Sequence, residues 1–404
     1  MKKIIISDYI YTKEKLLKNH AVVFDEKIIN IAPKSKILKE NKDAQIFEYP
    51  KNSLLFPGLI NAHVHIEFSG NKTELSYGNF INWLYSVIEN REDLMQKCDV
   101  GCMKQAIDSM LDSGITTFGA ISSHAMDIEA CKEAKQTVVF FNELIGSQAN
   151  IADILFNDFK QRLKKSLHVK RKGFIPAVAI HSPYSVHPIL IKKALEIVKK
   201  ENLRLTAHFM ESEAEREWLD HNSGDFAEFF TKLLKQEKAV SSADEFLDYF
   251  ADIPTLFAHG INSNDEELQK IKDAHHTIVH CPISNRLLGN KTLDIKRLQE
   301  KGIDWIVATD GLSSNYALDL WEEMKISLFN HPELPLLEFA TDLLDGVTKT
   351  AAKALNLPKG EIKAELDSDM IVLQLDHQPT PELLVHLIVR KYPIIDKFIL
   401  GEKI

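Results

Sequence analysis

The sequence predicts an α/β protein in which a (β/α)8 barrel carries a small β domain built from both ends of the chain. Two observations lead to this fold. Short apolar segments alternate with charged segments of helical periodicity through the middle of the chain, and strand-like segments occur before and after them. The expected domains are residues 1–56 and 359–404 for the two parts of a small β-sandwich, and residues 57–358 for the barrel.

The candidate barrel strands are short and apolar, and each is followed by polar residues. They cover residues 59–65, 115–122, 137–146, 174–182, 204–212, 255–260, 276–284 and 304–311. Between them lie segments such as PILIKKALEIVKKEN and NDEELQKIKDAH, in which apolar residues recur at helical spacing. A doubly wound open sheet is the alternative. No Gly-x-Gly-x-x-Gly follows the first strand, so a dinucleotide site is not supported.

The two ends of the chain have a different texture from the middle. The stretches IIISDYIYT, NHAVVFDEKIINIAP and AQIFEYP near the start are rich in β-branched and aromatic residues and are separated by turn residues. After about residue 360 the segments DMIVLQLD and KFILGEKI read the same way. We therefore expect both ends to form one small β domain beside the barrel.

The overall composition excludes several classes of protein. The chain has 404 residues and a net charge of −9, with its lysines spread among acidic residues, so we expect no nucleic-acid partner. No segment approaches about 18 uninterrupted apolar residues, so we expect no membrane span. The four cysteines are Cys98, Cys102, Cys131 and Cys281. We do not expect them to form a disulfide framework, and a reduced, cytoplasmic location is the default expectation.

The stretch FPGLINAHVHIEFSG places His63 and His65 one residue apart at the end of the first candidate strand. Residues i and i+2 of a strand point to the same side, so both imidazoles should face one way. They either share a metal ion or are two unrelated polar residues at a strand end. The pair alone does not decide between these readings.

Residues able to bind metal recur at the ends of other candidate strands. They are His181, His208, Glu211, His259 and Asp310. In a barrel of this kind the active site lies at the carboxyl ends of the strands, so these side chains should converge. One strand-end histidine is more often structural than a ligand, but the coincidence across five strands favours a metal site.

The inferred ligand set is His63, His65, His208 and Asp310. Three imidazoles and a carboxylate suit one divalent ion, zinc first, with ferrous iron or manganese as alternatives. Such an ion lowers the pKa of a bound water toward about 7, which makes hydroxide available at neutral pH.

Five motifs, PGLINAHVH, TAHFMESEAE, FAHG, HCPISNRLLG and VATDGLSSN, resemble the amidohydrolase superfamily in its mononuclear deaminase and chlorohydrolase branch. The resemblance covers nearly the whole chain, including the split β domain, and implies a metal-dependent hydrolase barrel. Binuclear members bridge their metals with a carbamylated lysine on strand four. Here that strand ends in AVAIHSPYS, without a lysine, which favours a single ion.

The same chemistry suggests roles for the catalytic residues. Glu211 lies three residues after His208 and should carry a proton from the water to the ring nitrogen and then to the leaving amine, like the glutamate of zinc nucleobase deaminases. His259 should hydrogen-bond the hydroxide or the tetrahedral intermediate, and Asp310 should also accept the water proton. Two alternatives stay open: Glu211 as a helix cap, and His259 as a second metal ligand or a structural residue.

The resemblance also implies an adenosine-type nucleoside as substrate. The segment FINWLYSVIENREDL resembles a stretch of the S-adenosylhomocysteine and methylthioadenosine deaminases in which a glutamate binds the ribose hydroxyls. Glu92 takes that role by this alignment, with Glu89 as its rival and an exposed helix carboxylate as the alternative. A carboxylate is a suitable acceptor for a diol. His181 resembles the strand-four histidine that contacts substrate in related deaminases.

The region after strand three narrows the range of expected substrates. Relatives that accept S-adenosylhomocysteine place arginines there, whereas this chain reads FFNELIGSQAN. The motif FNELIG is closer to the 6-aminodeoxyfutalosine deaminases of menaquinone biosynthesis, whose adenosine-like substrate carries a benzoate-bearing extension on the ribose. The expected reaction yields futalosine and ammonia through attack of metal-bound hydroxide on purine C6. Ser147, Gln148 and Arg91 are candidates to meet the benzoate.

Other functions remain as alternatives at this point. They are a deaminase of S-adenosylhomocysteine or methylthioadenosine, a guanine deaminase or chlorohydrolase with the same ligands, and a non-catalytic metal-binding scaffold. The presence of both Glu211 and Asp310 argues against the scaffold. The expected partner is a small-molecule nucleoside, with no nucleic acid and no membrane, and a homo-oligomer is compatible with the resemblance.

Overall fold

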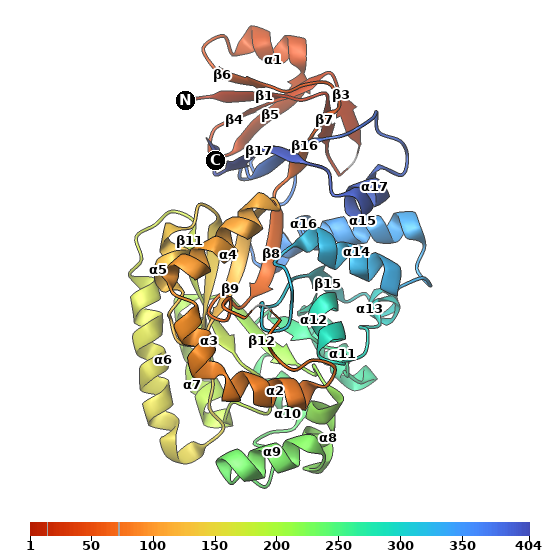
Figure 1. Ribbon diagram of the computed structural model, residues 1–404. Coiled ribbons are helices and arrows are strands. Elements are labelled where there is room, and N and C mark those ends of the chain that lie inside the picture. Colours follow the sequence, from red (N-terminus) through yellow and green to blue (C-terminus); the bar gives the residue numbers. More distant parts are fainter. Residues whose placement is uncertain (14, 72) are drawn as a thin grey trace.

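A parallel sheet of eight strands forms the centre of the computed structural model, which describes residues 1–13, 15–71 and 73–404 (Figure 1). The strands are β8 (Leu59–Val64), β9 (Ile115–Ser122), β10 (Thr137–Leu144), β11 (Phe174–Ile180), β12 (Leu205–Phe209), β13 (Leu256–His259), β14 (Thr277–His280) and β15 (Asp304–Val307). They neighbour one another in chain order, and the Asp310 N–H donates to the His63 carbonyl across the two end strands at 3.1 Å. The predicted eight-stranded barrel is confirmed.

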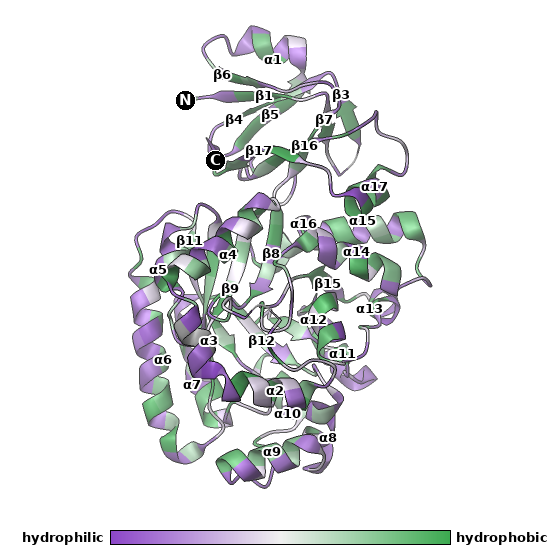
Figure 2. Cartoon of the chain, viewed as in Figure 1, coloured by the Kyte–Doolittle hydropathy of each residue, from purple (hydrophilic) through white to green (hydrophobic). Residues whose placement is uncertain are grey.

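Helices cover the outside of this sheet (Figure 1). In chain order they are α2 (Phe80–Glu89), α3 (Arg91–Lys97), α4 (Val100–Asp112), α5 (Ile128–Glu133), α6 (Ala152–Leu167), α7 (Pro188–Glu201), α8 (Glu213–His221), α9 (Asp225–Leu234), α10 (Ala243–Tyr249), α11 (Asp265–Asp273), α12 (Pro282–Leu287), α13 (Ile295–Lys301), α14 (Leu320–Asn330), α15 (Leu336–Gly346) and α16 (Lys349–Ala354), with a short 3-10 turn at Ala149–Ile151. Helix α6 is amphipathic: it mixes hydrophobic and hydrophilic residues in Figure 2 and buries Phe159 and Leu163.

The small domain is a β-sandwich of two sheets. Its N-terminal elements are β1 (Lys3–Ile6), β2 (Tyr9–Tyr11), β3 (Leu16–Lys18), β4 (His20–Phe24), β5 (Ile28–Pro33), α1 (Lys34–Glu40), β6 (Gln45–Glu48) and β7 (Ser53–Pro57), and its C-terminal elements are β16 (Met370–Gln374), α17 (Leu383–Arg390), β17 (Ile394–Ile399) and β18 (Glu402–Lys403). Because β16 pairs with β7 on one side and β17 on the other, both chain ends share one sheet (Figure 1). Phe24, Leu55 and Phe398 pack in the core between the sheets.

The small domain and the barrel join within two residues. Strand β7 ends at Pro57 in the sandwich, and β8 begins at Leu59 in the barrel. The domain limits at residues 56 and 358 stay predictions. None of the described helices has the length and apolar character that crossing a membrane requires.

The expectation for the cysteines is wrong for one pair, because Cys98 and Cys102 form a disulfide with their Cα atoms 5.1 Å apart. Residues four apart would lie on one side of a continuous helix. Instead α3 ends at Lys97 and α4 begins at Val100 after an N-cap at Asp99, whose side chain accepts from the Cys102 N–H. The chain turns at this break and brings the two sulfurs together. Cys131 and Cys281 are buried and free.

Candidate metal centre and active site

The carboxyl ends of β8, β12 and β15 bring the four predicted ligands together. His65 Nε2 lies 3.3 Å from His208 Nε2 and 3.5 Å from Asp310 Oδ1. His63 Nε2 lies 3.7 Å from the same Asp310 oxygen. Strand alternation accounts for the paired histidines of β8, and the closure of the barrel places β15 beside them. Their role as ligands stays a prediction, and their convergence supports it.

The chemistry of the cluster fits a divalent cation. His63 is fully buried, and neither of its ring nitrogens has a hydrogen-bond partner. The His208 Nδ1–H donates to the His181 carbonyl at 3.1 Å. The Nε2 of this ring therefore carries a free lone pair, and this nitrogen faces the cluster. Burial lowers the pKa of His63 and that of His208 well below the ordinary value, and neighbouring histidines lower both further. Neutral imidazoles are the form that binds metal.

Asp310 supplies the negative charge of the cluster. Burial alone would raise its pKa, but the nearby His65 and His63 outweigh this effect and lower the pKa to about 2. Its Oδ2 accepts from the Ser284 hydroxyl at 2.8 Å and the Ser314 hydroxyl at 2.7 Å. The carboxylate is therefore ionised and fixed in direction, with Oδ1 turned toward the histidines.

The backbone at this corner is adapted to the close approach of two strands. Asp310 has φ +57°, and His259 at the end of β13 has φ +74°. Such conformations are rare for residues with side chains and gather at functional sites. Gly311 follows Asp310, and a Cβ at this position would lie 2.8 Å from His65 Cβ. Only glycine leaves room for the histidine.

Glu211 and His259 lie beside the cluster as a second polar pair. Glu211 Oε1 is 3.5 Å from His259 Nε2, and His259 Nδ1 lies 3.0 Å from Asn285 Oδ1, the oxygen to which it donates. Burial raises the pKa of Glu211 well above its ordinary value, and the charges of Asp310 and Glu215 raise it further. Glu211 therefore binds a proton more readily than an exposed glutamate does, which suits a proton carrier.

One alternative for Glu211 is excluded, and one for His259 stays open. Helix α8 is capped by Ser212, whose hydroxyl accepts from the Glu215 N–H at 3.1 Å, so Glu211 is not the cap. The ring nitrogens of His63, His208 and His259 lie within 4.8 Å of one another. His259 as a further metal ligand therefore remains compatible with the geometry.

The remaining predicted contacts differ in placement. His181 follows β11 and lies beside His208, with its Nδ1 2.6 Å from the Ser185 hydroxyl. Glu92 lies on α3 with its side chain exposed, and its contact with ribose stays a prediction. Ser284 and Asn285, which belong to the motif HCPISNRLLG, contact Asp310 and His259 respectively.

Glu143 is a candidate functional residue that the sequence reasoning missed. It is buried near the carboxyl end of β10; one carboxylate oxygen accepts from the Ser123 hydroxyl at 2.5 Å, and the other has no partner. Ligand atoms of Glu143, His181 and His208 lie within 4.8 Å of one another. The strand-end rule that singled out the histidines would also have found the glutamate in FFNELIG, had it been applied to carboxylates on every strand.

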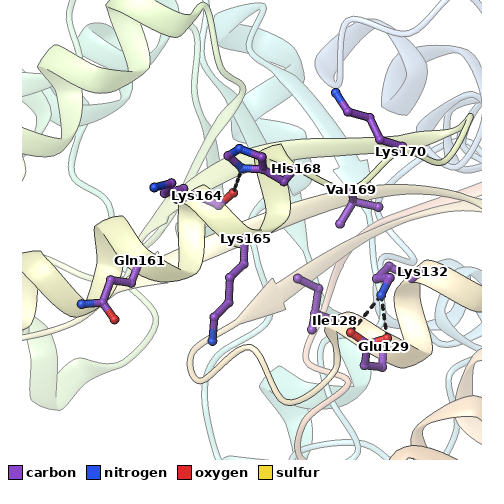
Figure 3. A pocket seen from close by; sticks show the side chains of 9 residues that line it. All are labelled: Ile128, Glu129, Lys132, Gln161, Lys164, Lys165, His168, Val169 and Lys170. Atoms are coloured by element: carbon purple, nitrogen blue, oxygen red, sulfur yellow. Dashed lines mark hydrogen bonds and ion pairs between the residues drawn. The ribbon is translucent and has the colours of Figure 1, made fainter.

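A separate hollow on the outer wall contains none of these residues. It has a volume of about 670 Å³ and lies beside α5 and α6 (Figure 3). Lysines dominate its lining, but Lys132 is paired with Glu129, and the His168 Nδ1 donates to the Lys164 carbonyl. It holds no buried carboxylate or histidine cluster, so the strand-end cluster is the site where chemistry is expected.

A barrel with three imidazoles and a carboxylate at its strand ends, and a buried glutamate beside them, belongs to the class of metal-dependent hydrolases. The family comparison specifies the class further. The chain belongs to the amidohydrolase family, whose model matches residues 54–399. The predicted superfamily is confirmed.

Relatives of known activity share most of the chain. A Nitratiruptor aminodeoxyfutalosine deaminase is 45% identical over 396 residues, which cover 98% of this chain and 97% of the relative. A Helicobacter pylori adenosine deaminase is 38% identical over 92% of this chain and 90% of its own. The crystal structure of Helicobacter pylori aminofutalosine deaminase with methylthio-coformycin matches with a TM-score of 0.94, 33% identity and full coverage of both chains. The protein is thus a hydrolase that acts on carbon–nitrogen bonds.

Proposed function

We propose that this enzyme removes the exocyclic amine of 6-aminodeoxyfutalosine to give futalosine and ammonia, as a cytoplasmic step of menaquinone biosynthesis. The observation that carries the proposal is the buried set of His63, His65, His208 and Asp310 with the Glu211–His259 pair directly beside it. The near full-length likeness to deaminases supports the substrate.

The ligand set would hold one divalent ion, and we propose zinc, with ferrous iron or manganese also suited to these donors. When bound, the ion lowers the pKa of a coordinated water toward about 7 and so supplies hydroxide at neutral pH. The low pKa of Asp310 keeps a carboxylate in the set across the working pH range.

The proton steps fall to the residues of the chain. Glu211 carries one proton from the water to the purine ring nitrogen as C6 is attacked, and then a second proton from the same water to the departing amine, and the raised pKa of Glu211 supports this role. His259 has its Nδ1–H engaged by Asn285, so its Nε2 accepts a hydrogen bond from the attacking water. The Asp310 carboxylate is the alternative acceptor for that proton.

Two further residues would position the substrate. His181 holds the purine, with its ring direction fixed by Ser185. Glu92 accepts hydrogen bonds from the ribose hydroxyls.

The test is a panel assay of the purified protein with 6-aminodeoxyfutalosine, adenosine, methylthioadenosine, S-adenosylhomocysteine and guanine. We expect ammonia release and the spectral change from an adenine to a hypoxanthine nucleoside, fastest with 6-aminodeoxyfutalosine. Metal analysis should find about one divalent ion per chain, and its removal by a chelator should abolish turnover. Activity on guanine alone, or full activity without metal, would refute the proposal.

A further inference from the structure

A line of polar side chains leads away from the predicted metal site across the strand ends. In the sheet, β12, β11, β10 and β9 are successive neighbours. Each contributes one group: His208, His181 and Glu143 lie within 4.8 Å of one another, and Glu143 bonds to the hydroxyl of Ser123, which directly follows β9. Three strand spacings of about 4.8 Å make this line about 14 Å long. A purine near His208 would leave the far part of the line for its substituent.

Arg91 lies at the far end of this line. Its Nη2 donates to His124 Nε2 at 2.7 Å, and His124 follows Ser123 in the chain. A guanidinium has no acceptor, so this bond requires an unprotonated imidazole nitrogen. Burial lowers the pKa of His124, and the Arg91 charge lowers it further although Glu67 opposes both effects. The partner of Arg91 is therefore neutral, and the positive charge of the guanidinium is not cancelled.

No carboxylate pairs with Arg91 among residues 1–13, 15–71 and 73–404. Arg162, which is also close to these strand ends, differs in this respect. Its guanidinium pairs with Asp158 at 2.7 Å and donates to the carbonyls of Ser122 and Glu143. Arg162 therefore holds two strands together, whereas Arg91 keeps N–H donors and a charge for a group from outside the chain.

The loop that carries His124, the partner of Arg91, is held rigidly. The buried Glu67 carboxylate accepts from the backbone N–H groups of Ser123, His124 and Met126 at 2.8 to 3.0 Å. These three bonds fix the loop that carries His124, and His124 fixes the arginine. A preorganised guanidinium loses little freedom when it binds an anion.

The other two residues considered for the benzoate are less suited to this role. Ser147 is buried and offers one neutral hydroxyl. The Gln148 side chain donates to the Leu234 carbonyl on α9 at 3.0 Å. Neither carries a charge that would favour an anion.

We propose that Arg91, held by His124, binds a carboxylate on the ribose substituent and selects nucleosides that carry one. This inference rests on the proposed deaminase function. A guanidinium meets a carboxylate through two parallel N–H bonds, which gives both affinity and geometric selection. The residue that would bind the carboxylate is thus an arginine at the start of α3, and not one that follows strand three.

The experiment compares 6-aminodeoxyfutalosine with its methyl ester, which adds one methyl group and removes the charge. In the wild type we expect a higher kcat/KM for the acid than for the ester. In Arg91→Gln the acid-to-ester ratio should fall about 10- to 100-fold, mainly through KM for the acid, because a charged hydrogen-bonded pair is lost. Arg91→Lys should restore part of the ratio.

Lys97→Gln is the matched control, because Lys97 lies on the same helix, is exposed and pairs with Glu74 at 3.2 Å. It should leave the ratio as in the wild type. An unchanged ratio in Arg91→Gln, or an equal loss for acid and ester, overturns the role of Arg91 while the deaminase function stands. A wild type that deaminates no adenine nucleoside overturns both.

Discussion

At the scale of single residues, the site depends on two carboxylates whose pKa values are shifted in opposite directions. Asp310 is surrounded by histidines and by serine hydroxyls that favour its charge, and its pKa is lowered to about 2. Glu211 is buried beside other carboxylates, which raises its pKa well above the ordinary value. Groups with pKa values separated in this way can serve as a fixed charge and a proton carrier in one site.

This division of roles makes Glu211→Gln informative. Glutamine keeps the size of the side chain but carries no transferable proton, so we expect kcat to fall by about 10²- to 10⁴-fold. Metal content, measured by elemental analysis, should stay at the wild-type level because Glu211 lies outside the ligand set. Glu213→Gln is the control, because Glu213 is exposed and forms a surface pair with Lys291. Near-normal turnover in Glu211→Gln would disprove the proton-transfer role.

Sequence reasoning identifies candidate residues where the barrel repeat fixes their position. The strand-end histidines and Asp310 were found because each sits at a fixed place in the barrel repeat. Glu143 was missed because the strand-end rule was applied mainly to histidines, and Ser314 was missed because its role depends on its contacts with Asp310 and Ser284. No rule of spacing predicts that Ser284 and Ser314 meet on one oxygen of Asp310.

At the scale of the secondary-structure elements, the barrel strands agree with the sequence within a few residues, because buried parallel strands read as short apolar runs. The interruption between α3 and α4 was not foreseen. There the Asp99 side chain caps a new helix, and a local polar contact of this kind overrides the helical spacing of Cys98 and Cys102.

Helix α8 shows how an element fixes a catalytic residue. Ser212 caps it, and the buried Glu215 in its first turn accepts from the Glu211 N–H at 2.8 Å. Burial raises the pKa of Glu215 from 4.5 to about 7, although its backbone hydrogen bonds oppose the rise. The Glu211 backbone is thus held by a carboxyl group that resists ionisation.

The raised pKa of Glu215 predicts a pH-dependent stability. Between pH 4.5 and about 7 the Glu215 carboxyl group binds more protons in the folded protein than in the unfolded chain. The contribution of Glu215 to the unfolding free energy therefore falls as the pH rises through this range. Glu215→Gln removes this contribution. The unfolding free energy of the variant relative to wild type should therefore increase with pH over this window, by about 3 kcal/mol. Urea unfolding from pH 4.5 to 8 measures this difference. If the unfolding free energies of wild type and Glu215→Gln changed in parallel with pH, the prediction would be contradicted. In the control Glu213→Gln, the unfolding free energy should change in parallel with that of the wild type.

At the scale of the whole molecule, a buried ion pair joins the two chain ends to the barrel. Lys359 Nζ lies 2.5 Å from Asp369 Oδ2, and both side chains are 1% exposed. The ammonium also donates to the Thr137 hydroxyl of β10 at 2.9 Å. Asp369 accepts from the Leu400 N–H through its side chain and from the Gly58 N–H through its carbonyl. One pair therefore connects β10, the start of the barrel and the last strands of the sandwich.

Removing the lysine should loosen this junction. Lys359→Met leaves the Asp369 carboxylate buried without its partner, and we expect a loss of about 3 to 5 kcal/mol of stability. The double variant Lys359→Met with Asp369→Leu removes the stranded charge as well and should recover much of that loss, because apolar groups can replace a buried pair at small cost. Chemical unfolding of the full chain measures both.

Lys353→Met is the control, because Lys353 forms an exposed pair with Asp304, and the loss of this pair should cost at most about 1 kcal/mol. Two results would show that the pair does not hold the sandwich to the barrel. One is a loss of unfolding free energy in Lys359→Met as small as in the control. The other is a double variant that is less stable than the single variant.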